Sequence, residues 1–70
     1  MAESVYKIIE LVGTSPESWE AAARAAVERA SSTLRDLRIA EVEKLDMTVD
    51  NNKVALYRAR VKLSFKYEEG

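Results

Sequence analysis

Oxygen-bearing side chains gather in one short stretch beyond the middle of the chain. Asp46, Asp50, Asn51 and Asn52 lie within seven residues, and carboxylate and amide oxygens are the ligands that hard cations such as calcium prefer. The spacing is not that of an EF-hand, because the central Gly and the closing Glu are missing. Two interpretations stay open: a solvated turn, or a divalent-cation site completed within this stretch or by a second subunit.

Side chains for catalysis are scarce. The sequence contains no His and no Cys, which removes the usual imidazole base and thiolate chemistry. Glu41 and Glu43 come nearest to a catalytic carboxylate pair, but basic residues of a neighbouring strand are expected to neutralise both. The other acidic residues show no spacing that separates them from surface charge. We therefore expect a protein that is not an enzyme.

Basic side chains alternate along the last part of the chain, at Arg58, Arg60, Lys62 and Lys66. A sheet that binds single-stranded nucleic acid also needs aromatic side chains on the same face, to stack on bases. Here the aromatic residues of this part have the opposite parity: Tyr57, Phe65 and Tyr67. Eleven basic and twelve acidic residues leave a net charge of -1, so no overall field attracts a polyanion. We expect no nucleic-acid partner.

Three segments have the pattern of β-strands, over residues 4–12, 38–49 and 54–67. The first is β-branched and stops at Gly13, and the last two are separated by a turn at residues 50–52, where Asn tolerates positive φ. The last strand alternates between apolar and polar residues. Pairing it with the preceding strand places Ala40 and Val42 on the apolar side, and Glu41 and Glu43 on the basic side, opposite arginines.

A helix is predicted over residues 16–34, with Ser15 as its N-cap and Pro16 at the first helical position. The Gly13–Glu17 step has one Gly and no following Lys-Ser/Thr, so it indicates capping rather than a phosphate loop. One stripe of the helix is apolar and mostly alanine. Its members are Trp19, Ala22, Ala23, Ala26, Val27, Ala30 and Leu34. Trp19 is the one large anchor, in the core or at an interface.

The element order predicts an α+β fold, a single domain over residues 1–70. A helical crossover followed by a hairpin inserts the third strand between the other two, as in a split β-α-β unit with a right-handed crossover. This gives a three-stranded antiparallel sheet with one helix packed on it. No apolar run approaches the roughly 20 residues of a membrane span, and the N-terminus has no secretory pattern.

The chain is small for an independent domain. Below roughly 70–80 residues a single core barely offsets the entropy of ordering the chain, and small domains add disulfides, metals or subunit contacts. Disulfides are excluded here, and the first strand is apolar on both faces, with Val5, Ile9 and Leu11 on one side and Ile8 and Val12 on the other. We expect a homo-oligomer.

The pattern as a whole resembles the dodecin family. The resemblance is carried by Val5-Tyr6-Lys7, by Glu10-Leu11-Val12-Gly13-Thr14-Ser15 before an alanine-rich helix, by Ala40-Glu41-Val42, and by Tyr57 with the strand that ends near Phe65. It covers nearly the whole chain. It implies a hollow cytoplasmic homododecamer that binds and stores a small ligand without catalysis, typically pairs of flavins held across a two-fold axis.

The sequence departs from the flavin-binding pattern at two positions. Ile39 stands where the resemblance implies a Trp that stacks on the flavin ring, and Arg58 stands where it implies a Gln that hydrogen-bonds the ring. An anion or Glu41 would have to separate Arg58 from its two-fold mate. We therefore expect binding of flavin (FMN or riboflavin) to be weakened in a pocket formed by Ile39, Glu41 and Arg58.

The Ile39 and Arg58 combination, together with Asp46 and Asp50, looks more like the branch described as calcium dodecins. That likeness implies a calcium-binding shell without flavin as the alternative. By chemistry alone, the predicted cation ligands are Asp46, Asp50 and Asn51.

Overall fold

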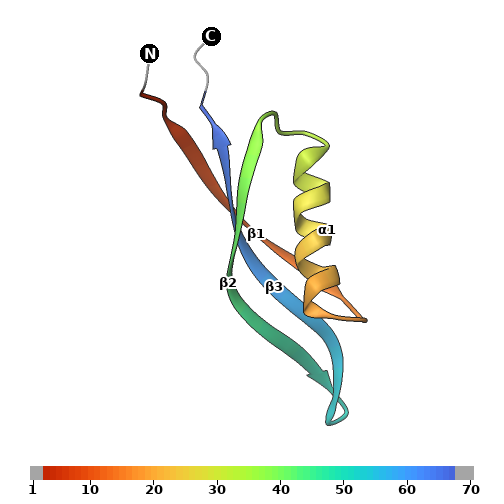
Figure 1. Ribbon diagram of the computed structural model, residues 1–70. Helices are drawn as coiled ribbons and strands as arrows, with labels where there is room; N and C mark the ends of the chain where they lie inside the picture. Colours follow the sequence, from red (N-terminus) through yellow and green to blue (C-terminus); the bar gives the residue numbers. More distant parts are fainter. Residues whose placement is uncertain (1–2, 68–70) are drawn as a thin grey trace.

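The fold is a three-stranded sheet with one helix on one of its faces (Figure 1). A computed structural model describes residues 3–67, as strand β1 (Tyr6–Ser15), helix α1 (Trp19–Ser31), strand β2 (Leu37–Asp50) and strand β3 (Lys53–Lys66). The strand order is β1-β3-β2, and both outer strands run antiparallel to β3. The predicted α+β class, element order and inserted third strand are confirmed. The single domain predicted over residues 1–70 also includes 1–2 and 68–70, which lie outside the described residues.

The helix begins and ends inside the predicted range of 16–34. Its N-cap is Ser18, whose side chain accepts a hydrogen bond of 3.0 Å from the Ala21 amide, so Ser15 as N-cap and Pro16 as first helical residue are wrong. Ser15 is the last residue of β1, opposite Tyr57, and its Oγ accepts a hydrogen bond of 3.0 Å from the Glu17 amide. The helix starts only beyond this turn, where Ser18 is the cap. Helix α1 is neither long nor apolar enough to cross a bilayer, and residues 3–67 contain no other helix.

Strand β1 runs from Tyr6 to Ser15, so it starts and ends later than predicted. Gly13 lies within the strand and does not end it. Gly13 lies opposite Ala59 in the sheet, and its missing side chain allows the helix to approach. A Cβ atom at this position would lie 2.0 Å from the carbonyl oxygen of Ala22 and 3.1 Å from the Cβ of Ala26. Gly13 therefore fixes the closeness of helix and sheet.

The core lies between α1 and the central strand β3. It consists of six buried residues, four of them alanine, and these are Ala22, Ala26, Ala30, Ala59, Val61 and Leu63. Within the helix the predicted stripe is confirmed, since Ala23 and Val27 pack against this cluster as well. Leu34 also packs against it, but from beyond the end of the helix at Ser31. The helix covers mainly β1 and β3 and barely touches β2. Val42, Leu45 and Met47 on the helix side of β2 thus stay exposed in a single chain, whereas Leu37 packs against the core.

The hairpin between β2 and β3 turns at Asn51 and Asn52, which have φ of 55° and 64°. Positive φ at both central residues is typical of the type I′ turn that matches the twist of a hairpin, and the prediction for residues 50–52 is confirmed. The alternation along β3 is confirmed too, with Ala59, Val61 and Leu63 buried beneath the helix. We call the opposite side of the sheet, which carries Arg58, Arg60 and Lys62, the outer face.

The pairing of β2 with β3 shifts at Glu43. Val42 lies opposite Val61 but Lys44 lies opposite Arg60, so Glu43 is an extra residue in β2, as in a β-bulge. Beyond the bulge the parity is inverted. Because of this shift Asp46 lies opposite Arg58 on the outer face; in an unshifted ladder it would face Tyr57 on the helix side.

Candidate functional site

The residues predicted for the flavin-equivalent pocket share the outer face but not one location. Ile39 lies opposite Ser64, Glu41 opposite Lys62, and Arg58 opposite Asp46. Ser64 and Arg58 are six residues apart on β3, which corresponds to about 20 Å of strand. A single chain therefore separates Ile39 from Arg58, and a pocket that uses both requires a neighbouring copy.

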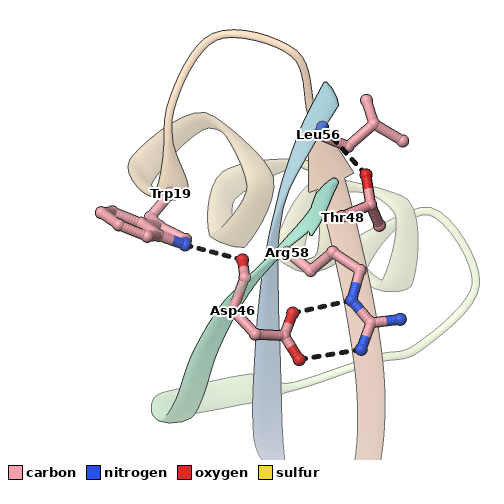
Figure 2. Close-up of polar contacts among 5 residues, drawn as sticks. All are labelled: Trp19, Asp46, Thr48, Leu56 and Arg58. Carbon is pink, nitrogen blue, oxygen red and sulfur yellow. Dashed lines mark hydrogen bonds and ion pairs between the residues drawn. The ribbon is translucent and has the colours of Figure 1, made fainter. Parts of the chain in front are cut away.

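Arg58 forms a two-point ion pair with Asp46 across β2 and β3 (Figure 2). Its Nε donates to Oδ1 of Asp46 at 2.7 Å, and its Nη2 donates to Oδ2 at 2.8 Å. The two side chains are 40% and 46% exposed, so the pair stands at the surface. The hydrogen bond from Arg58 lowers the pKa of Asp46, and the same bond raises the pKa of Arg58.

Asp46 is also held through its main chain. The indole Nε1 of Trp19 donates a hydrogen bond of 2.9 Å to the Asp46 carbonyl oxygen (Figure 2). The same indole meets Tyr57 edge-on, with ring centroids 5.1 Å apart. The sequence predicts Trp19 in the core or at an interface but gives no sign of this bond, since nothing in the sequence relates a helix residue to a carbonyl 27 positions away.

The acidic residues predicted opposite arginines are paired with a lysine instead. Glu41 lies opposite Lys62, and Glu43, at the bulge, contacts the Lys62 ammonium at 3.0 Å. The hydrogen bond from Lys62 lowers the pKa of Glu43, and the same contact raises the pKa of Lys62, helped by the nearby Glu10 and Glu41. Glu43 is therefore held in an ion pair.

The predicted cation ligands are spread along the hairpin. Asp46 and Asp50 are four residues apart on β2, about 13 Å of strand, and Asn51 lies in the turn. Within residues 3–67 there is no group of three His, Cys, Asp or Glu side chains close enough to hold a metal ion. Both Asp46 oxygens already accept hydrogen bonds from Arg58. A cation site that includes these residues requires oxygens from another copy or displacement of Arg58.

Two shallow, mainly apolar grooves flank Trp19 on the helix side. One, of about 420 Å³, is lined by Glu17, Ser18, Trp19, Glu20, Leu45 and Tyr57. The other, of about 310 Å³, is lined by Trp19, Glu20, Ala23, Val42 and Leu45. Both lie where α1 leaves β2 uncovered.

Comparison with known proteins agrees with this architecture. Residues 5–68 match the family model described as Dodecin. The chain is 49% identical over 63 residues to the calcium dodecin of Mycobacterium tuberculosis. The aligned residues cover 90% of this chain and 89% of the relative. It is 45% identical over 65 residues to the dodecin of Thermus thermophilus, covering 93% and 94%.

The structure of dodecin from Streptomyces coelicolor superposes on the whole chain. The TM-score is 0.93 at 40% sequence identity, and all of both chains is covered. Family model, sequence relatives and structure therefore lead to one assignment. The chain belongs to the dodecin family.

Proposed function

We propose that this chain is a non-enzymatic subunit of a hollow, homododecameric shell that binds and stores a small ligand, and that its flavin-stacking site is altered. The observation that supports an altered site is the ion pair between Asp46 and Arg58. Arg58 stands where the family resemblance implies a Gln that hydrogen-bonds flavin, and its side chain is already bound to Asp46. The same resemblance supports twelve subunits and the cytoplasm as the compartment.

The exposed apolar surface supports assembly. On the outer face, Ile8, Val12 and Ile39 are 58%, 47% and 60% exposed. On the helix side, Val42, Leu45 and Met47 of β2 are each more than 40% exposed. Large apolar side chains on both faces of one sheet exceed what a small monomer usually leaves in water, and a shell that contacts both faces would bury them.

The two substituted positions argue against the usual stacking of flavin. Ile39 offers no aromatic face, and each lost aromatic contact weakens binding by about 0.5–1.5 kcal/mol beyond the buried area. Arg58 carries a charge that is already matched by Asp46, so a flavin ring would have to compete with a carboxylate for its hydrogen bonds.

A calcium-binding shell without flavin is the second candidate. The observation that favours it is the 49% identity to a relative named calcium dodecin, together with the oxygen-rich hairpin at Asp50 and Asn51. Since one chain does not group three acidic ligands among its described residues, the proposed cation would lie between copies.

Native mass spectrometry of the freshly purified protein tests both candidates. A twelve-subunit peak whose excess mass fits calcium and disappears with a chelator supports the calcium shell. A twelve-subunit peak with an excess mass fitting flavin contradicts the altered site at Ile39 and Arg58. A monomer would overturn the shell itself. A variant with Asp50→Asn and Asn51→Gly is the matched sample for calcium, because Gly tolerates the positive φ of the turn, so the variant should assemble equally well and lose the ion.

A further inference from the structure

Three cations surround the Asp46 carboxylate on the outer face. Arg58 lies opposite Asp46, and the neighbouring pair on the same face is Lys44 opposite Arg60. Such neighbouring pairs are about 7 Å apart along the strands. Arg58, Arg60 and Lys44 are also the charges that act on Asp46, and all three lower its pKa. We call these three residues the basic cluster.

Without Asp46 the basic cluster would be suited to an anion. Like charges placed directly opposite each other in a sheet, as Lys44 and Arg60 are, destabilise it unless an anion lies near them. The fork of a guanidinium matches the two oxygens of a carboxylate or phosphate. In this chain, the Nε and Nη2 of Arg58 already engage both Asp46 oxygens, at 2.7 Å and 2.8 Å.

We propose that the Asp46 carboxylate is a built-in anion that occupies the basic cluster, so that this part of the ligand site accepts uncharged groups and excludes phosphate and carboxylate groups. The inference rests on the proposed function in one respect, since it names the class of ligand that the shell would take. A phosphate approaching the remaining edge of Arg58 would lie beside the Asp46 carboxylate and be repelled.

The position of Asp46 supports this role. Its main chain is fixed by the hydrogen bond from Trp19 at 2.9 Å, so the carboxylate is presented to Arg58 by an anchored residue. The bulge at Glu43 places it on the outer face. Asp46 therefore acts as a specificity-determining residue through Arg58, whose charge it cancels.

Titration with inorganic phosphate, followed by ³¹P NMR at constant pH and ionic strength, tests the proposal. Asp46→Asn keeps the size of the side chain and the Trp19 contact but removes the charge. This variant should bind phosphate at least about tenfold more tightly than the unaltered protein, in line with a hydrogen bond to a charged group. The gain should vanish when Arg58→Gln is added to Asp46→Asn.

The matched control is Glu28→Gln, which removes one exposed carboxylate from the helix, away from the basic cluster, and should leave phosphate binding near Arg58 unchanged. Equal phosphate affinity of the unaltered protein and the Asp46→Asn variant would overturn the proposal. So would a gain that persists in the double variant, or an equal gain in Glu28→Gln. Native mass spectra of the same samples report the shell separately, so a failed assembly and a failed anion exclusion are told apart.

Discussion

The indole nitrogen of Trp19 donates a hydrogen bond of 2.9 Å to the main-chain carbonyl of Asp46. This bond connects the first turn of α1 to β2, the strand that the helix otherwise barely touches. An edge strand presents unpaired carbonyls that attract other chains, and Trp19 satisfies one of them. The side chain of Asp46 meanwhile accepts from Arg58, so one residue is held by the helix and by the central strand.

Trp19→Phe should lower the melting temperature by an amount equivalent to about 1 kcal/mol, because an aromatic ring remains but the hydrogen bond is lost. Thermal unfolding followed by circular dichroism, at one fixed protein concentration, measures the change. Tyr57→Phe is the control, since it keeps the ring that meets Trp19 edge-on. If Trp19→Phe and the unaltered protein melt together, the bond contributes nothing to stability.

Gly13→Ala should destabilise the fold more than any exposed substitution on β1. The added Cβ would lie 2.0 Å from the Ala22 carbonyl, and relieving that clash requires the helix to move away from the sheet. Overpacking of this kind typically costs about 1–3 kcal/mol, sometimes more. Urea unfolding compares this variant with Thr14→Ala, the adjacent exposed position. Similar midpoints for the two would contradict the close approach at Gly13.

The two ion pairs of the outer face predict a loss of stability in acid. The pKa of Asp46 lies below its ordinary value of 3.8 because Arg58 donates to it, and the pKa of Glu43 lies below 4.5 because Lys62 donates to it. When folding lowers the pKa of a carboxylate, the carboxylate contributes its full stabilisation of the fold at pH values above its unfolded-state pKa. This contribution is lost as the pH falls through the lowered, folded-state pKa.

Melting curves between about pH 3 and about pH 7 should therefore be level at the upper end and fall below about pH 4.5. In a double variant with Asp46→Asn and Glu43→Gln the fall should be smaller, because the two groups no longer titrate. Glu28→Gln, at an exposed position of the helix, is the control that removes a carboxylate without removing one of these ion pairs. An equal acid slope in all three proteins would show that these pairs do not link folding to pH.

Flavin binding should be gained by restoring the two residues that the family resemblance implies. Ile39→Trp combined with Arg58→Gln provides an aromatic face and an uncharged hydrogen-bonding side chain. We expect the affinity for riboflavin to rise by about two- to tenfold, because one stacking contact per flavin contributes about 0.5–1.5 kcal/mol. Quenching of flavin fluorescence measures it, with Arg58→Gln alone as the control. Unchanged quenching in the double variant would show that Ile39 and Arg58 do not line the flavin pocket.

The sequence by itself determined the elements and their order. Alternation along 57–67 predicted which face of β3 is buried, and Ala59, Val61 and Leu63 are buried. The paired asparagines predicted the hairpin turn, and the alanine stripe predicted the helix face. These patterns are local, because the periods of strand and helix repeat within a few residues. The same local patterns, read as a resemblance, indicated the family.

Only the tertiary structure decided which charged side chains of the outer face pair with one another. An unbroken ladder would place Glu43 opposite Arg60, but the bulge at Glu43 shifts the register so that Lys44 meets Arg60 and Asp46 meets Arg58. Likewise, the sequence predicts Ser15 as the helix cap, but Ser15 pairs with β3 as the last residue of β1, and Ser18 caps the helix. Register and bulges depend on how two distant strands pack against one helix. Residues that are far apart in the chain set that packing, so no short stretch of sequence records it.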